Sequence, residues 1–422
     1  MVHSLFPFIG PGHPFFAQVE EFRRRIAEHP RASAWADGHA RRPTTIHAEI
    51  KALPAPGGGW QFDRFYWSLQ SWDAAASQPF DAITLSYAAK TGQTEWYAFP
   101  QDSYLTTMAE FFGGEAAPVE VLRYVPLRRL TFRGRGSGGE PLIGKFKRRS
   151  RFREAYGLLG VVADAVAEAV PGFAVSRPLA IDEARCLYYQ SALAGTNLAD
   201  AVDRENCDDL LAAVGALHRS LHEVPVAALP VADGAALLDG VRRDMAWITY
   251  FEPQHAALFD HVLALLQRHA GAVLGGPAVF CHGDFVCSQI LMADEGWSVT
   301  DFDLCHRGDP YRDMAILLAS LPYDLPLFQA GAEADSPADG SLLERAAAAY
   351  LRGYAEQAGA PIDALRLAWH RIGAEIYYLA LMLKKDRFAR PLADHRLDLV
   401  RAQARRLEVF DTPTGADRVR VG

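Results

Sequence analysis

The stretch "CHGDFVCSQILM" at residues 281–292 decides how this chain is interpreted. A His-Gly-Asp triplet at 282–284 follows its first residue, and its last four residues, "QILM" at 289–292, have the composition of a short β-strand. A second strand-like run, "WSVTDF" at 297–302, follows after a few residues. The two runs predict a β-hairpin that carries three oxygen-bearing side chains in order, namely Asp284, Gln289 and Asp301.

These three side chains have the chemistry that phosphoryl transfer needs. The reaction requires a carboxylate that orients the attacking hydroxyl and oxygen ligands that hold Mg²⁺ on the phosphates of ATP. We expect Asp284 to receive the proton of the acceptor, and Gln289 and Asp301 to hold the metal. His282 is expected to orient the loop. The alternative, loop aspartates that only form turns, is disfavoured by the ordered set and its two predicted strands.

The same segments resemble the aminoglycoside phosphotransferase and choline kinase-like superfamily, a branch of the protein-kinase fold, over about residues 119–410. In that family an HGDxxxxN loop is followed by an aspartate in a DFG-like position and then by a GDPxxD segment. The segment "GDPYRD" at 308–313 matches the last of these, and the resemblance implies that Asp313 braces the catalytic loop. An aspartate early in a predicted helix is also favoured by the helix dipole, and both roles can hold.

Gln289 stands where the family pattern has asparagine. Glutamine keeps the amide oxygen and lengthens its reach by one methylene, so the ligand is retained. The loop is similar to the "HGDxxxxQVL" loops of maltokinase-like members, which are sugar kinases with an N-terminal cap domain.

The resemblance also implies a lysine on the third strand of the smaller lobe. The run "PLIGKFKRR" at 141–149 places Lys145 and Lys147 on one face of a strand. We expect Lys145 to be the family lysine, because "RYVPLRR…GKFKR" resembles the relatives' "RYKPGRR…GKVYR". Glu154, on the helix predicted to begin near Phe152, is expected to pair with it, although a solvated surface glutamate is the alternative.

The nucleotide site implied by the resemblance has two further parts. The turn "VPLRR" at 125–129 occupies the place of a glycine-rich loop but has no glycine, so Arg128 or Arg129 is expected to assist there. The backbone of Gln190 and of Ala192, in "LYYQSALAG", is expected to hydrogen-bond adenine. "GRGSGGE" at 134–140 lies too close to Lys145 for a phosphate loop and predicts a hairpin turn.

The chain divides by pattern into a sheet-rich first part and a helix-rich second part, which is an α+β organisation. Residues 1–118 predict one helix and a small antiparallel sheet, a cap-like region that ends near "FFGGEAAP" at 111–118. Residues 119–190 predict the smaller, sheet-containing lobe, and residues 191–422 the helical lobe with the catalytic loop. The expected fold is therefore a protein-kinase-like bilobal fold preceded by a cap region.

Composition and net charge limit the classes of partner that we expect. The chain has 422 residues, a net charge of −8 and no long basic run, so neither nucleic acid nor an anionic membrane surface is an expected partner. No apolar stretch is long enough to span a bilayer, and five scattered cysteines without a CxxC pair indicate a reducing cytoplasm. The sequence leaves the oligomeric state open. His218 and His222 lie one helical turn apart without a third metal ligand in view, which predicts one packed and one solvent-facing histidine.

We therefore expect an ATP- and Mg²⁺-dependent phosphotransferase acting on a hydroxyl group of a small molecule, with a sugar favoured over an aminoglycoside antibiotic. A nucleotide-binding pseudokinase that engages a protein partner through residues 1–118 is the main alternative. The proton-accepting Asp284 argues against it, since a scaffold has no need of this group. A hydrolase with metal on His282 and Asp284 lacks further ligands.

Overall fold

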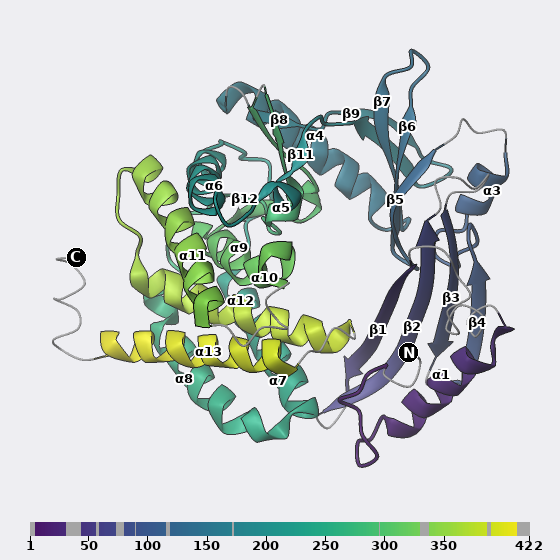
Figure 1. The fold of residues 1–422 in the computed structure, drawn as a ribbon, viewed down its shortest axis with the longest axis horizontal. Helices are drawn as coiled ribbons and strands as arrows, with labels where there is room; N and C mark the ends of the chain where they lie inside the picture. The colour runs from purple at the N-terminus through teal and green to yellow at the C-terminus, as the bar shows by residue number, and fades with distance from the viewer. Residues whose placement is uncertain are drawn as a thin grey trace.

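The computed structural model describes residues 5–30, 44–55, 59–72, 80–88, 90–114, 119–170, 173–294, 296–329, 337–385 and 390–411. The predicted α+β organisation is confirmed, with the strands of the first part and the helices of the second lying on opposite sides of the molecule (Figure 1).

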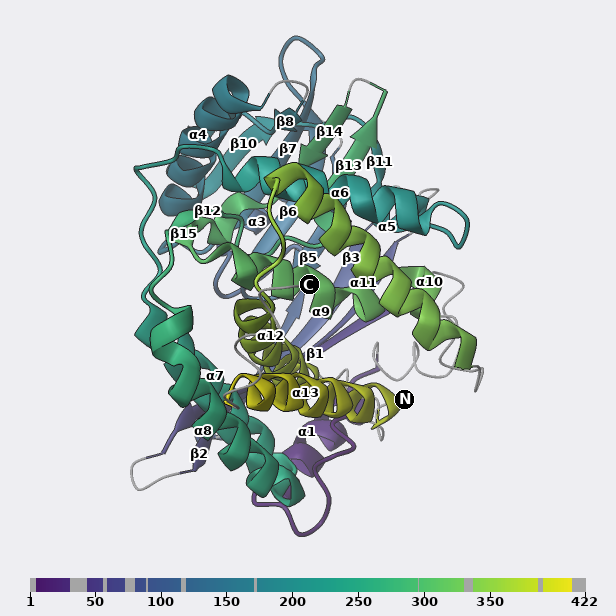
Figure 2. The same ribbon diagram turned by 90° about the vertical axis from the view of Figure 1, so that its left-hand side faces the viewer.

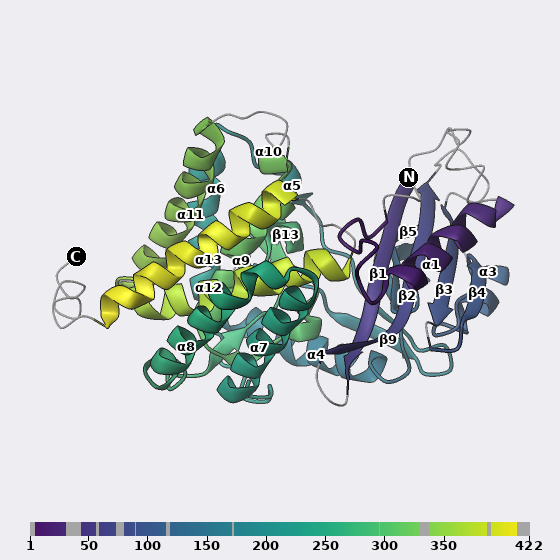
Figure 3. The ribbon, with the colours of Figure 1, turned by 90° about the horizontal axis from the view of Figure 1, so that it is seen from below.

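The N-terminal region forms the expected helix and antiparallel sheet. Helix α1 (Phe16–Glu28) lies on a four-stranded meander of β1 (Thr44–Pro54), β2 (Trp60–Trp72), β3 (Phe80–Ala88) and β4 (Gln93–Ala98), and α3 (Met108–Gly113) follows. Val19, Phe22 and Ile26, spaced three to four residues apart, are the buried face of α1. Figure 3 shows α1 alongside this sheet, away from the helical lobe. Of the predicted boundary "FFGGEAAP", residues 115–118 lie outside the described part of the chain.

The second sheet has the order β5-β6-β7-β10-β9. Its strands are β5 (Glu120–Val125), β6 (Arg129–Arg135), β7 (Pro141–Lys147), β9 (Pro178–Asp182) and β10 (Leu187–Ser191), with helix α4 (Phe152–Ala169) between β7 and β9 in the chain. The three strands expected between 119 and 147 are thus confirmed, as is the hairpin turn between β6 and β7, which Gly136 closes by donating its N–H to the Glu140 carbonyl at 2.8 Å.

The helical lobe contains the predicted catalytic hairpin. The short strands are β8 (Phe173–Val175), β11 (Thr196–Asn197), β12 (Val279–Cys281), β13 (Ile290–Ala293), β14 (Gly296–Val299) and β15 (His306–Gly308), and β13 and β14 form the expected antiparallel pair. The helices are α5 (Leu198–Ala201), α6 (Cys207–His222), α7 (Gly234–Phe251), α8 (Ala256–Val273), α9 (Pro310–Asp324), α10 (Pro326–Gln329), α11 (Pro337–Ala358), α12 (Ala364–Lys384) and α13 (Arg390–Phe410). Figure 2 shows α6 and α11 side by side above α12 and α13. None of the helices within the described ranges is both long and apolar enough to cross a bilayer.

The N-terminal sheet packs against both the helical lobe and the second sheet. One apolar core joins residues of α1 and β1–β3 to α7, α8, α12 and α13. A second core joins Phe80 and Phe99 to Tyr124 and Phe132 of the second sheet. Two side chains of β2 also bond the outer strand β5, since Gln70 donates to the Tyr124 carbonyl at 3.1 Å and Trp72 to the Val121 carbonyl at 3.3 Å. The N-terminal sheet therefore covers the open edge of the second sheet. The proposed division at residue 118 stays a prediction.

Candidate active site

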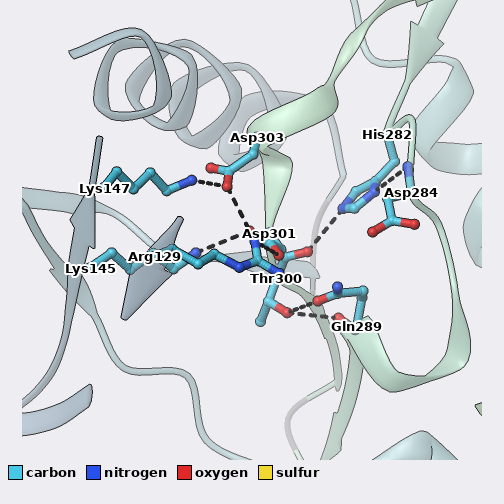
Figure 4. Close-up of polar contacts among 9 residues, drawn as sticks. All are labelled: Arg129, Lys145, Lys147, His282, Asp284, Gln289, Thr300, Asp301 and Asp303. Atoms are coloured by element: carbon cyan, nitrogen blue, oxygen red, sulfur yellow. Dashed lines mark hydrogen bonds and ion pairs between the residues drawn. The ribbon is translucent and has the colours of Figure 1, made fainter. Parts of the chain in front are cut away.

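Side chains from the second sheet and from the loops of the helical lobe meet at one place (Figure 4). Arg129, Lys145 and Lys147 come from β6 and β7, whereas His282, Asp284 and Gln289 come from the segment between β12 and β13. Asp301 lies just after β14. The structure thus brings the lysine, the HGD loop and the downstream aspartate together, as the sequence predicts.

Asp301 is held between two cations. Lys145 Nζ lies 3.3 Å from its Oδ1 and Arg129 Nη1 lies 3.1 Å from its Oδ2. Burial alone would raise the pKa of Asp301, but the charges of Lys145, Arg129 and Lys147 outweigh burial and hold that pKa below its usual value. Asp301 also has a left-handed backbone, with φ of 68°, which is uncommon for a residue other than glycine. Its carboxylate is therefore charged and held in a specific direction.

A second ion pair lies beside the first. Lys147, two residues after Lys145, contacts the carboxylate of Asp303, and Arg129 Nη1 lies 3.7 Å from the same carboxylate. Burial, and then the charge of Lys145, lower the pKa of Lys147 to about 7. Sequence reasoning noted Lys147 but assigned it no partner, and it missed Asp303. The matching two-residue spacing in "KFK" and "DFD" is the signal that could have identified both.

The side chains of Arg128 and Arg129 point in different directions. Arg129 faces the site, whereas Arg128 is 48% exposed and points to Glu49 of β1, with 3.5 Å between Nη1 and Oε2. Arg129 pairs with Lys147 in the sheet, so it projects from the same face as the two lysines, and its neighbour must project elsewhere. Of the two arginines expected to assist here, Arg129 therefore faces the site and Arg128 does not.

Glu154 also differs from the expectation. Its side chain is exposed, and its carboxylate pairs with Arg151 at an N–O distance of 2.9 Å. The buried face of α4 carries Ala155 and Leu159, one residue further round the helix, so Glu154 points outward. Lys145 pairs with Asp301 instead.

The HGD loop is fixed by its own histidine and by Asp313. The His282 ring lies 2.9 Å from the Thr300 carbonyl through Nε2, while Nδ1 accepts from the Asp284 amide at 3.3 Å. Asp313 accepts from the backbone N–H of His282 at 2.5 Å and of Gly283 at 2.9 Å. Gly283 has a φ of 82°, and a Cβ there would lie 2.3 Å from the Leu304 carbonyl oxygen. Side-chain hydrogen bonds and the close approach at Gly283 therefore hold the backbone of the loop.

Asp313 makes its contacts in a fully buried cluster. The Nε2 atoms of His218 and His222 lie 3.7 and 3.8 Å from its Oδ2, and their Nδ1 atoms bond the hydroxyls of Tyr350 and Tyr354. The expectation of a solvent-facing histidine is wrong, because α11 covers this face of α6. His218, His222 and Asp313 do bring three potential metal ligands within 4.8 Å of one another. A structural zinc site takes four, so we interpret the cluster as a support for the loop.

The carboxylate of Asp284 is available for chemistry. Among the residues drawn in Figure 4, no side chain forms a hydrogen bond or ion pair with this carboxylate. Burial and the nearby charge of Asp301 raise its pKa, and the charge of His282 opposes them. A half-buried aspartate of this kind is a stronger base than a solvated one.

Gln289 lies beside Thr300, the residue before Asp301. Its Oε1 accepts from the Thr300 hydroxyl at 2.9 Å, and its backbone carbonyl accepts from the Thr300 amide at the same distance. The amide oxygen thus lies next to the Asp301 segment (Figure 4). An amide oxygen and a buried, charge-compensated carboxylate form a set of hard oxygen donors that fits Mg²⁺.

Gln190 and Ala192 lie at the end of β10. A small pocket extends from Lys145 and Asp301 between β7, β10 and α4 as far as Tyr188 and Gln190. The N–H of Ser191 donates to the Arg177 carbonyl at 2.9 Å and that of Ala192 to the Pro141 carbonyl at 3.4 Å. The bond from Ala192 is the longer and weaker of the two. The contact of Gln190 and Ala192 with adenine stays a prediction.

Comparisons with known proteins identify related sequences and a shared fold. The sequence profile described as "Phosphotransferase enzyme family" matches residues 129–365, more than half of the chain. Streptomycin 3''-kinase of Streptomyces griseus is 32% identical over 168 residues, which are 36% of this chain and 60% of that protein. The chain therefore matches less than two thirds of that relative's length.

Solved structures show the same fold. A crystal structure of aminoglycoside phosphotransferase APH(4)-Ia gives a TM-score of 0.50 at 15% identity, covering 71% of this chain and 96% of the other. A thermostable mutant of the same enzyme, in ternary complex with AMP-PNP and hygromycin B, gives 0.51 at 17% identity with the same coverage. At this identity the likeness concerns the fold alone, and it confirms the expected kinase-like α+β architecture.

Proposed function

The chain belongs to the phosphotransferase enzyme family, and on this premise we propose that it transfers a phosphoryl group from ATP to a hydroxyl group of a small molecule, with Mg²⁺ as the metal. The observation that carries the proposal is the meeting of Asp284, Asp301 and Lys145 at one site between the two lobes. Each supplies a different requirement of the reaction, namely a proton acceptor, a metal ligand and a cation for the phosphates.

The roles follow from the contacts. Asp284 orients the acceptor hydroxyl and takes up its proton, because its carboxylate is uncommitted among the described residues and its pKa is raised. Asp301 and Gln289 would hold Mg²⁺, which when bound neutralises charge on the transferring group. Lys145 and Arg129 bind the phosphates, and Arg129 extends from a turn that has no glycine. His282 and Asp313 keep the loop in place.

Two alternatives are less consistent with the site. A metal-dependent hydrolase using His282 would need a free ring nitrogen, yet both ring nitrogens of His282 are engaged with the backbone. A pseudokinase would not need an Asp284 carboxylate that is free to accept a proton and has a raised pKa.

For the acceptor, we propose a neutral sugar or a sugar-containing compound. Its support is the Gln289 loop, which resembles the loops of maltokinase-like members, and the presence of an N-terminal region in the place of their cap domain. Streptomycin 3''-kinase, by its name, acts on an aminoglycoside, which makes an aminoglycoside the second candidate.

A panel of acceptors tests the proposal. Sugars, aminoglycosides, choline and amino alcohols are each incubated with protein, ATP and Mg²⁺, and acceptor-dependent ADP release is measured. We expect release with at least one sugar and its loss on chelation of Mg²⁺. Release with aminoglycosides alone would overturn the sugar assignment and keep the kinase, whereas a wild-type protein that binds no Mg·ATP in calorimetric titration would overturn the kinase.

A further inference from the structure

Asp102, at the end of the N-terminal sheet, bonds the turn between β5 and β6. It follows β4 by four residues, is 6% exposed, and accepts four hydrogen bonds. Oδ1 accepts from the amides of Tyr104 at 2.8 Å and Leu105 at 3.0 Å, both in its own segment. Oδ2 accepts from the Tyr124 hydroxyl at 2.8 Å and from the Leu127 amide at 2.7 Å. One carboxylate thus joins the N-terminal region to β5 and to the turn that follows it.

The turn needs such support. Leu127 has a φ of 61°, in the left-handed region that a leucine rarely adopts, and its side chain is fully buried. Asp102 holds its N–H, and Arg148 Nε donates to its carbonyl at 2.6 Å. The Arg148 guanidinium in turn lies 4.4 Å from the ring centroid of Tyr104, again in the N-terminal region. Both backbone groups of the strained residue are therefore fixed by side chains.

The turn leads directly into Arg129, the first residue of β6, whose guanidinium reaches Asp301. Pairing with Lys147 sets the face of the sheet from which Arg129 projects. The turn at residues 126–128 is where the strand that carries Arg129 starts, so a rotation at the turn would shift that start. A glycine-rich loop could move to meet a nucleotide, whereas this turn is fixed in advance.

We propose that the N-terminal region is a built-in positioning element for the nucleotide site, and that Asp102 is its positioning residue, holding the Leu127 turn so that Arg129 is directed at the phosphates. This inference rests on the proposed function, since it assumes that the β5–β6 turn covers ATP. It assigns the segment around Asp102 a role in positioning the active site.

Asp102→Asn tests the inference with Tyr124→Phe as matched control. Asparagine has one accepting oxygen in place of two, so either the Leu127 amide or the Tyr104 and Leu105 amides lose their acceptor. Tyr124→Phe removes a hydrogen bond to the same carboxylate and leaves the Leu127 amide bonded. We expect Asp102→Asn to raise the KM for ATP about tenfold, the factor that loss of one hydrogen bond to a charged group amounts to, with a smaller change in kcat. Tyr124→Phe should lower the melting temperature and leave this KM unchanged.

Arg148→Gln supplies a second variant if Asp102→Asn folds poorly, because it releases the Leu127 carbonyl from the other side. It should raise the KM for ATP as well. Combined with Arg129→Gln, either variant should add little to the effect of Arg129→Gln alone, since both act through the same guanidinium. Hydrogen exchange of a peptide containing residues 125–129 should become faster in Asp102→Asn and in Arg148→Gln.

Equal effects of Asp102→Asn and Tyr124→Phe on the KM for ATP, or full additivity with Arg129→Gln, would show a purely structural role and overturn the inference. Either result leaves the proposed function intact, because the wild-type protein still binds Mg·ATP in both. Failure of the wild-type protein to bind Mg·ATP is a different outcome and overturns the proposed function itself.

Discussion

At the scale of single residues, Asp284 combines a fixed backbone with an uncommitted carboxylate. The loop around it is held by His282 and Asp313, so the side chain can be changed without moving its neighbours. This makes Asp284 the position at which the reaction mechanism is most directly tested.

Replacement of Asp284 by alanine should lower kcat by roughly 10²–10⁴-fold, because it removes acceptor orientation and proton uptake together. The affinity for Mg·ATP should change little, which calorimetric titration measures. Asp294→Ala, in the exposed turn between β13 and β14, serves as control and should behave as wild type. Near-wild-type turnover of Asp284→Ala would contradict the assigned role.

The pH dependence of kcat should report the raised pKa of Asp284. Burial and then Asp301 raise that pKa, so the carboxylate becomes protonated, and unable to accept a proton, at a higher pH than an ordinary aspartate with a pKa of about 3.9. As pH falls, kcat should therefore decline through a midpoint above this value. Asp301, with its lowered pKa, stays ionised over the same range and does not cause the decline. An acid limb at or below the ordinary value would argue that Asp284 is not the base.

Gln289 is tested by two substitutions of different chemistry. Gln289→Asn keeps an amide oxygen and should retain activity in part, whereas Gln289→Leu has no oxygen and should lose about 10- to 100-fold in Mg²⁺ affinity and in kcat. A Mg²⁺ titration at saturating ATP distinguishes the two. If the leucine variant needs no more Mg²⁺ than the wild type, Gln289 is not a ligand.

At the scale of elements, strand β7 and helix α4 determine which charge compensates Lys145. The strand directs Lys145 and Lys147 toward the segment at 301–303, where Asp301 and Asp303 have the same spacing. Helix α4 turns its apolar face inward and leaves Glu154 on its solvent face. The compensating acid therefore comes from the segment after β14 and not from the helix.

Substitution of Glu154 by alanine should consequently leave the KM for ATP unchanged and alter the free energy of unfolding by no more than about 0.5 kcal/mol, as exposed ion pairs contribute little. Lys145→Ala should raise that KM strongly, because it removes a phosphate-binding cation and leaves one oxygen of Asp301 unpaired. Steady-state kinetics in ATP and chemical denaturation measure both effects. An equal rise in KM in the two variants would restore Glu154 as the partner of Lys145.

At the scale of the whole molecule, the N-terminal region and the helical lobe share a core of aromatic side chains. Phe8 and Phe15 lie 5.3 and 6.2 Å from Phe251 of α7, and Trp60 lies 4.9 Å from Trp247, as distances between ring centroids. A core that is common to both ends of the chain couples their unfolding.

Phe65→Ala, in the middle of β2, should therefore destabilise the helical lobe as well as the sheet. Phe65 is fully buried, and loss of its ring should cost about 3–5 kcal/mol. We expect the helical signal in far-UV circular dichroism to unfold at a lower denaturant concentration in a single transition. Leu53→Ala, at a side chain that is 61% exposed, is the control and should have little effect. An unchanged helical transition in Phe65→Ala would show that the N-terminal region unfolds independently.

The sequence by itself determined the α+β organisation, the three strands from 120 to 147 and the hairpin of β13 and β14. It also identified Asp284, Gln289, Asp301 and Lys145 as candidate site residues. These features depend on short-range signals, because strand periodicity, turn residues and motif spacing act within a few tens of residues. The same signals predicted that residues 134–139 form a hairpin turn and not a phosphate-binding loop.

Only the tertiary structure decided which charges meet. Lys145 and Arg129 contact Asp301, although 156 and 172 residues separate them from it in the sequence. Glu154 lies only nine positions from Lys145, yet its side chain points to solvent. The burial of both His218 and His222 beside Asp313, and the bond from Asp102 to the Leu127 turn, likewise depend on how distant elements pack. The reason is physical: the direction of a side chain and the burial of its charge are fixed by the faces that elements present to one another, and a local sequence pattern does not specify the partner.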